Sequence, residues 1–162
     1  MQLVYVNSDY VSYLRGFDRR VRMNKSHRPY LGIVLSINGF RYFAPLESSK
    51  PGKRVNSQLG YNVWDNPNGD DDPISFLLLN DMIPVDKACY TPINLDSEKK
   101  NNFEKYTLLL AEVNYIRPKE EAIMERAKKI YVNRTEKDIH FINKMCLDFK
   151  DLESRLTDYL AR

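Results

Sequence analysis

The sequence predicts a mixed α+β protein in which a compact, strongly bent antiparallel sheet or barrel is surrounded by helices and followed by a helical C-terminal half. Two observations carry this prediction. Short apolar runs of strand length recur at close spacing in the first half, and from residue 96 onward the apolar residues follow a helical period. The chain has 162 residues, of which 43% are hydrophobic. That size suits one domain covering residues 1–162.

The clearest single element is a β-hairpin. Tyr30–Ile37 and Phe40–Leu46 are apolar runs separated by Asn38-Gly39. Asn-Gly favours a type I′ turn, because that turn needs positive φ at both central residues. We expect the second strand to end near Pro45, which lacks the N–H group that a sheet ladder requires. The polar segment 47–53 would then form a loop held by the hairpin.

Other strands and helices follow from the spacing of apolar residues. We expect strands at 1–6, 61–64, 74–79, 82–85 and 88–93, and helices at 9–17, 96–116, 118–132, 135–145 and 147–160. Ser8, Asp96 or Ser97, and Thr135 with Asp138 are the predicted capping residues. An Asp triplet at 70–72 lies in a turn-rich segment and indicates a solvated acidic loop.

Several classes of protein and site do not fit the sequence. No apolar run approaches the roughly 18 residues that span a bilayer, and the N-terminus lacks the pattern of a secretory signal. Cys89 and Cys146 are isolated, which indicates reduced, buried thiols in a cytoplasmic protein. No zinc-ligand spacing, P-loop or familiar hydrolase motif occurs. We therefore expect no metal, no cofactor and no membrane association.

Positive charge is unevenly distributed. The net charge is only +3, but basic residues gather in two segments: Arg15, Arg19, Arg20, Arg22, Lys25, His27 and Arg28, then Lys50, Lys53 and Arg54. Such a cluster is either a solvated surface or a face that binds a nucleic-acid backbone. Tyr10 on the first helix has the same two interpretations, as a core residue or as a group that contacts RNA.

The segment after the hairpin carries groups suited to RNA cleavage without a metal. In that reaction the ribose 2′-OH attacks the adjacent phosphorus, and negative charge grows on the phosphoryl oxygens. The Ser48 hydroxyl and the Lys50 ammonium are suitable donors to those oxygens. Arg28, just before the first hairpin strand, could reach the same corner. Ser-Ser-Lys-Pro is also an ordinary turn sequence, so composition alone leaves this open.

Residues 30 to 50 resemble the signature of the ToxN/AbiQ family. The matching residues are Tyr30, Gly32, Ile33, Val34, Leu35, Gly39, Tyr42, Ala44, Pro45, Leu46, Ser48 and Lys50. This family comprises the endoribonuclease toxins of type III toxin–antitoxin and phage-defence systems. Weaker similarity at Tyr10, at 82–84 and at Phe149 extends the resemblance over most of the chain.

The resemblance implies a bent sheet related to the MazF/Kid toxins. It implies sequence-preferring, metal-independent cleavage of cellular or phage RNA that leaves a 2′,3′-cyclic phosphate and a 5′-OH. It also implies inhibition by a small repeat RNA, which the toxin itself processes into pseudoknot units. Toxin and RNA units usually alternate in a closed ring.

By the same resemblance, Ser48 and Lys50 match the family's loop serine and lysine. Lys50 would stabilise phosphoryl charge or protonate the leaving oxygen, and Ser48 would orient the 2′-OH or the phosphate. Arg28 takes the place of a basic family residue. Glu47 stands where relatives often have Thr, so it would either act as a base or weaken phosphate binding. The RNA-contacting set implied by position is Tyr10, Tyr30, Ser49 (a proline in many relatives), Lys53, Arg54 and Phe149.

Two other functions fit the same residues. A non-catalytic RNA-binding module would use the same tyrosines and basic segment, and would bind RNA in a salt-sensitive way. A small protein–protein adaptor would bind no RNA.

Overall fold

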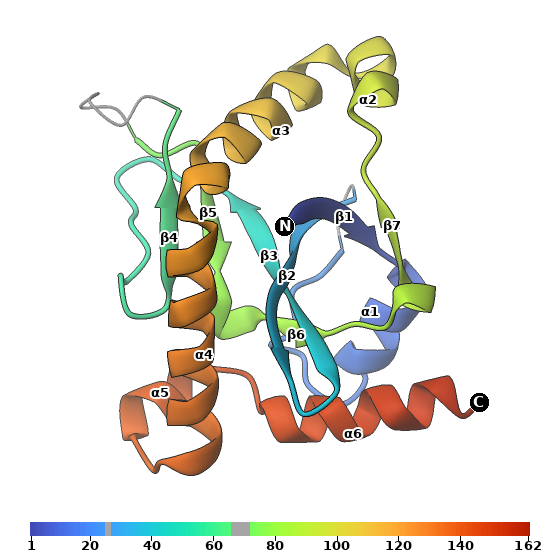
Figure 1. Ribbon diagram of the computed structural model, residues 1–162, viewed down its shortest axis with the longest axis vertical. Helices are drawn as coiled ribbons and strands as arrows, with labels where there is room; N and C mark the ends of the chain where they lie inside the picture. Colours follow the sequence, from blue (N-terminus) through green and yellow to red (C-terminus); the bar gives the residue numbers. More distant parts are fainter. Residues whose placement is uncertain (25–26, 66–71) are drawn as a thin grey trace.

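The strand β3 (Phe40–Ser48) pairs with three other strands, more than any other strand in the described residues. The structure is a computed structural model that describes residues 1–24, 27–65 and 72–162. Its antiparallel sheet has the order β4-β5-β3-β2-β1-β7, and β6 pairs with β3 beside this path (Figure 1). The other strands are β1 (Gln2–Val6), β2 (Pro29–Ile37), β4 (Gly60–Val63), β5 (Ser75–Leu78), β6 (Ile83–Pro84) and β7 (Tyr90–Pro92). Within the described residues β4 and β7 do not pair, so the sheet is open and the barrel alternative is wrong.

Helices make up the C-terminal half, as predicted, and the α+β class is confirmed. They are α1 (Ser8–Arg15), α2 (Leu95–Asn101), α3 (Phe103–Ile116), α4 (Glu120–Glu136), α5 (His140–Met145) and α6 (Phe149–Leu160). Figure 1 shows α3 running across one end of the molecule, from α2 to α4. In the described part of the chain no helix is long and apolar enough to cross a membrane.

Several predicted helix boundaries are wrong. The capping position of α1 is Asn7 and not Ser8, and the side chain that caps α2 is that of Asn94, not of Asp96 or Ser97. The helix expected at 96–116 is broken at Asn102, whose extended backbone ends α2 and whose side chain accepts the Lys105 N–H at 3.1 Å to cap α3. Thr135 does not cap the next helix. It lies inside α4, where its hydroxyl donates to the Tyr131 carbonyl oxygen.

The hairpin is confirmed, and its second strand is longer than predicted. Asn38 and Gly39 have φ of 52° and 81°, as a type I′ turn requires. β3 continues three residues past Pro45 because it changes partner there. Pro45 is the last β3 residue paired with β2 at Tyr30, and Leu46, Glu47 and Ser48 pair with β5 instead. This change of partner bends the sheet and places Ser48 at a strand end.

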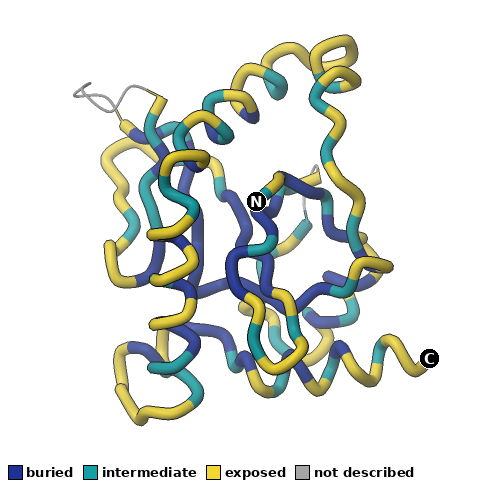
Figure 2. Tube along the Cα trace, in the orientation of Figure 1, coloured by how far each residue is buried: buried dark blue, intermediate teal, exposed yellow. Residues whose placement is uncertain are grey.

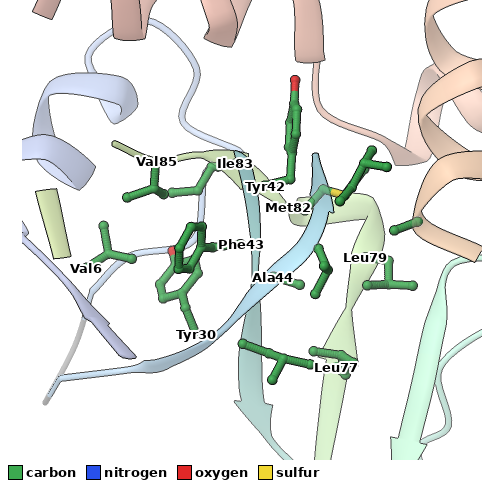
Figure 3. Packing of buried hydrophobic residues seen from close by; sticks show 14 of the residues in the cluster. Val6, Tyr30, Tyr42, Phe43, Ala44, Leu77, Leu79, Met82, Ile83 and Val85 are labelled. Atoms are coloured by element: carbon green, nitrogen blue, oxygen red, sulfur yellow. The ribbon is translucent and has the colours of Figure 1, made fainter. Parts of the chain in front are cut away.

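The core lies along β2 and β3, which are buried over most of their length (Figure 2). Figure 3 shows Tyr30, Phe43, Ile83 and Val85 packed together on one side of the hairpin. A Cβ atom on Gly32 would lie 1.9 Å from the Phe43 ring, so only glycine fits at that position. Cys89 and Cys146 are free and buried, in agreement with the prediction.

A buried glutamate ties three elements to one another. Glu153 Oε1 in α6 accepts hydrogen bonds from Tyr42 of β3 at 2.7 Å and from Tyr131 of α4 at 2.6 Å. Buried polar groups need hydrogen-bond partners, and this one carboxylate provides the acceptor for both phenols. The helical half is thereby fixed to the central strand.

Candidate active site

Ser48 and Lys50 are both exposed where β3 ends. Ser48 is held by its pairing with Ser75 of β5. The chain then makes a tight turn, in which the Lys53 N–H donates to the Lys50 carbonyl oxygen at 3.0 Å and Gly52 has φ of 73°. A proline at 51 and a positive-φ glycine at 52 are what a type II turn requires. The local sequence therefore fixes the backbone that carries Lys50.

These residues form one wall of a cleft whose other wall is α3. The cleft has a volume of about 660 Å³. It is lined by His27, Arg28, Pro29, Leu46, Glu47, Ser48 and Lys50 on the sheet side and by Asn102, Glu104, Lys105, Leu108, Leu109 and Glu112 on the α3 side. The structure thus brings together all four residues that were predicted to be catalytic.

The Arg28 guanidinium is fixed at the point where β3 leaves β2. Its Nη1 donates to the Leu46 carbonyl oxygen at 3.2 Å, and its Nε donates to the Met23 carbonyl oxygen at 3.2 Å. Leu46 lies just past the end of the β2 pairing. Arg28 therefore supplies a hydrogen bond at the bend and places a cation in the cleft.

Glu47 lies in the cleft with its charge already compensated. Arg22 donates from Nη1 to Glu47 Oε1 at 3.0 Å and from Nε to Asp81 Oδ2 at 2.8 Å. Burial raises the pKa of the Asp81 carboxyl, and the hydrogen bond from Arg22 partly offsets this. A carboxylate held by a guanidinium is a weak proton acceptor, so the ion pair argues against Glu47 as a general base.

The Lys50 ammonium forms no ion pair with any residue in the described ranges. Its side chain lines the cleft beside Ser48 and Arg28. A lysine in this state is available to a phosphate group, since no internal carboxylate competes for it.

Three residues predicted to contact RNA lie in the core, so these assignments are corrected. Tyr10, Tyr30 and Phe149 are each 0% exposed. The Tyr10 hydroxyl donates to the Pro84 carbonyl oxygen at 2.5 Å, and Tyr30 lies among apolar side chains in Figure 3. A base cannot stack on a ring that has no exposed face. These three aromatic side chains therefore pack in the core.

The other predicted RNA contacts are at the surface. Lys53 is exposed and Ser49 is half-buried. Arg54 is engaged by its own chain, since its Nη1 lies 2.9 Å from Asp72 Oδ1 and its guanidinium lies 5.1 Å from the centre of the Trp64 ring. That hydrogen bond also lowers the pKa of Asp72. Asp70 and Asp71 of the predicted acidic loop lie outside the described residues.

A second hollow, of about 560 Å³, adjoins the cleft and is strongly basic. Its charged lining residues are Arg15, Arg19, Arg20, Arg22, Arg28, Asp81 and Lys144. Arg28 lines both hollows, so the basic groove meets the cleft that carries Ser48 and Lys50.

Glu112 is a cleft residue that the motifs did not identify. It is 1% exposed, and its Oε2 accepts a hydrogen bond from Ser75 Oγ at 2.8 Å. Burial raises the pKa of its carboxyl to about 7, although the Ser75 hydrogen bond and the Lys105 charge act in the opposite direction. A sequence signal for it exists, because a glutamate at 112 shares a helix face with Leu109 and Ile116. A carboxyl on the buried face of a helix is unusual.

The chain matches the family described as toxin ToxN of the type III toxin–antitoxin system over residues 2–157. It belongs to this family. Endoribonuclease ToxN of Bacillus thuringiensis subsp. kurstaki is 31% identical over 97% of this chain and 83% of that protein. Endoribonuclease AbiQ of Lactococcus lactis subsp. lactis is 30% identical over 95% of this chain and 86% of that protein.

Solved structures of the family have the same fold. One, from work on selective toxin inhibition by a non-coding RNA pseudoknot in type III systems, superposes with a TM-score of 0.90 at 30% identity, over 99% of this chain and 98% of the other. The structure of AbiQ, described as a lactococcal anti-phage endoribonuclease of a type III system, gives 0.84 at 30% identity over the same shares. The family predicted from residues 30 to 50 is confirmed, and its curated members are endoribonucleases.

Proposed function

We propose that this chain is an endoribonuclease toxin that cleaves RNA by internal transesterification. The observation that carries this proposal is the Lys50 ammonium, unpaired within the described residues, beside the exposed Ser48 hydroxyl and the fixed Arg28 guanidinium in one cleft. Membership of the ToxN family supports the reaction class. The cytoplasm, which holds the cellular RNA, is the proposed compartment.

In the proposed reaction the ribose 2′ oxygen attacks the adjacent phosphorus and the bond from phosphorus to the 5′ oxygen breaks. The products are a 2′,3′-cyclic phosphate and a 5′-OH. Arg28 and Lys50 stabilise the charge that grows on the phosphoryl oxygens, and preorganised donors of this kind lower the barrier most. Lys50 also gives a proton to the leaving 5′ oxygen. Because these side chains supply both charge and proton, the scheme requires no metal ion.

Ser48 positions the reacting phosphodiester in this scheme. Its backbone is fixed by β5, so its hydroxyl is offered at a constant place to the 2′-OH or to a phosphoryl oxygen. The basic groove next to the cleft binds the flanking nucleotides through their phosphates, and Arg28 is the point where groove and cleft meet. This path orients a single strand across the corner.

We propose that a repeat RNA folded as a pseudoknot, released from its precursor by the toxin, inhibits the enzyme by occupying the same groove and cleft. Support comes from the structural relative reported with selective inhibition by an RNA pseudoknot. Alternating toxin and RNA units would form a closed ring. Light scattering of the purified complex measures this directly, and equal numbers of both components are expected.

The test is a single-turnover cleavage assay in the presence of a chelator. Lys50→Ala is expected to lower the rate by about 10²–10⁴-fold, the usual contribution of a proton-transfer group. Ser48→Ala is expected to lower it by about 10–10²-fold, because a hydroxyl donor to the reacting phosphate is lost. Lys129→Ala is the matched control, since Lys129 is exposed on α4 and does not line the cleft.

Full cleavage by both the Ser48 and the Lys50 variants would overturn the proposed site. Salt-sensitive RNA binding without any cyclic-phosphate product from the wild type would establish the non-catalytic RNA-binding alternative. The adaptor alternative would be established by the absence of RNA binding.

A further inference from the structure

The wall of the cleft opposite Ser48 and Lys50 contains a buried acid. Glu112 of α3 is 1% exposed and lines the same cleft as those two residues. Glutamates are almost never fully buried unless they are paired. Glu112 forms no ion pair within the described residues. Its burial therefore needs an explanation other than salt-bridge formation.

One oxygen of Glu112 is fixed to the strand that supports Ser48. Ser75 Oγ donates to Glu112 Oε2 at 2.8 Å, and Ser75 is the β5 residue directly opposite Ser48 of β3. Residues directly opposite one another in an antiparallel pair have side chains on the same face. The Glu112 carboxyl is thus oriented by the same strand pair that carries the Ser48 hydroxyl.

The other oxygen of Glu112 has no partner. Oε1 is buried and accepts no hydrogen bond from any described residue. A buried polar atom left unsatisfied costs stability and is uncommon in native proteins. One carboxyl oxygen held by an orienting donor and the other left available is the arrangement of a base in an enzyme.

Three other groups in the cleft compete for this role. Glu104 is exposed at the start of α3. Glu47 is occupied by Arg22 at 3.0 Å. His27 is exposed, and its ring packs against that of Tyr5, with centroids 5.3 Å apart. Among the described residues that line the cleft, only Glu112 combines burial, an orienting hydrogen bond and an acceptor atom without a described partner.

We infer that Glu112 is the general base of the reaction and that Oε1 takes the proton of the attacking 2′-OH. This inference rests on the proposed function. As the proton leaves the 2′ oxygen, that oxygen bonds to phosphorus, the bond to the 5′ oxygen breaks, and Lys50 protonates the leaving oxygen. Glu112 then gives its proton to water and Lys50 takes one from water, which restores both groups. Since Oε1 is covered in the free protein, entering RNA must displace the side chains over it, and hydrogen bonds at active sites commonly close only in the complex.

The ionisation of Glu112 suits this role. Burial raises the pKa of the carboxyl to about 7, so a useful fraction is ionised near neutral pH and the conjugate acid is weak enough to retain the proton. The titratable and charged side chains that line the cleft around it are His27, Arg28, Glu47, Lys50, Glu104 and Lys105, and β5 contributes the Ser75 hydroxyl. Of these, Lys105 and Ser75 act to lower the pKa of Glu112.

The experiment compares the rates of single-turnover RNA cleavage of four proteins between about pH 5.5 and 8.5. The wild-type rate is expected to rise with pH toward about 7 and then level off. Glu112→Gln keeps the shape of the side chain and removes the base. Its cleavage rate should be about 10²-fold lower than that of the wild type and should no longer increase with pH. Glu153→Gln, a buried glutamate outside the cleft, is the matched control and should keep both the rate and the rise. His27→Ala should keep the rise, because His27 is not the base.

A cleavage rate for Glu112→Gln within twofold of the wild type would overturn the inference. The inference would also fail if the cleavage rate no longer increased with pH in His27→Ala but still increased with pH in Glu112→Gln. If Glu112→Gln does not fold, Ser75→Ala serves as the second variant. Loss of its hydrogen bond raises the pKa of Glu112, so the rise must move to higher pH, and an unmoved rise would overturn the inference. A wild type that yields no cyclic phosphate would instead refute the proposed function.

Discussion

Two buried glutamates of this fold lie in different environments. Glu153 in α6 is 5% exposed and accepts two phenolic hydrogen bonds at 2.7 and 2.6 Å. Glu112 in α3 is 1% exposed, accepts one hydroxyl hydrogen bond and keeps its other oxygen without a partner among the described residues. The residue type is the same and both side chains are buried. The difference is that both oxygens of Glu153 have partners, since Lys150 pairs with its Oε2, whereas one oxygen of Glu112 has none among the described residues.

On the inference above, that difference distinguishes a structural acid from the acid assigned to the reaction. The hydrogen-bond donors to Glu153 Oε1 come from β3 and α4, so its carboxylate holds the hairpin against the helices. Its other oxygen, Oε2, lies 3.5 Å from Lys150 Nζ in an ion pair within α6. The only hydrogen-bond partner of Glu112 within the described residues comes from β5, beneath the cleft. A buried carboxyl thus indicates function only where at least one of its oxygens has no hydrogen-bond or ion-pair partner within the protein.

The most direct way to break this comparison is to remove Glu153. Glu153→Ala leaves two buried phenols without their acceptor and opens a cavity, so the free energy of unfolding should fall by about 3–4 kcal/mol. Urea titration measures this loss. The single-turnover cleavage rate per folded molecule should stay within about twofold of the wild type. A strong loss of rate in folded protein would show that Glu153 also serves the reaction.

The comparison is sharpened by the pH dependence of stability at Glu112. Burial raises its pKa from 4.5 to about 7, so between these values the folded state binds its proton more tightly than the unfolded state. Stability therefore falls as pH rises through this window. Glu112→Gln lacks this penalty and should be more stable than the wild type at pH 8, by about 1–3 kcal/mol. The gap should close toward pH 4.5, and a gap that is constant with pH would contradict this assignment.

The smallest effect is expected at Tyr30. Its hydroxyl is buried and has no hydrogen-bond partner among the described residues, so Tyr30→Phe removes an unsatisfied group. The free energy of unfolding should change by less than about 0.5 kcal/mol. RNA affinity, measured by filter binding, should stay within about twofold. A tenfold loss of RNA affinity would show that Tyr30 does contact RNA. Burial in the free protein would then not be a sufficient reason to exclude a residue from RNA binding.

The elements that sequence predicts best are those set by local geometry. Asn38-Gly39 specifies its turn through φ alone, and Lys50 is fixed by the turn of residues 50–53. That Glu47, Ser48 and Lys50 lie in one place could be predicted because they are close together in the chain. The end of β3 could not be predicted in this way. Pro45 would end the strand if β3 kept β2 as its partner, but from Leu46 onward β3 pairs with β5 instead.

The interior was harder to predict than the corner. A tyrosine or phenylalanine at helical spacing has the same pattern whether it packs or binds RNA, and Tyr10 and Phe149 pack. The ion pair of Glu47 with Arg22 joins residues 25 positions apart, and the Ser75–Glu112 hydrogen bond joins residues 37 apart. Such contacts depend on the tertiary fold, which spacing along the chain does not reveal.

The cleft is assembled from two walls of different origin, a sheet edge and the separate helix α3, and Figure 1 shows that helix set apart from the hairpin. Diversification of such toxins can therefore proceed on one wall at a time. Leu108 of α3 lines the cleft and is exposed, so it contributes little to the core. We expect its replacement to change how RNA fits the cleft without disturbing Ser48 and Lys50 on the opposite wall.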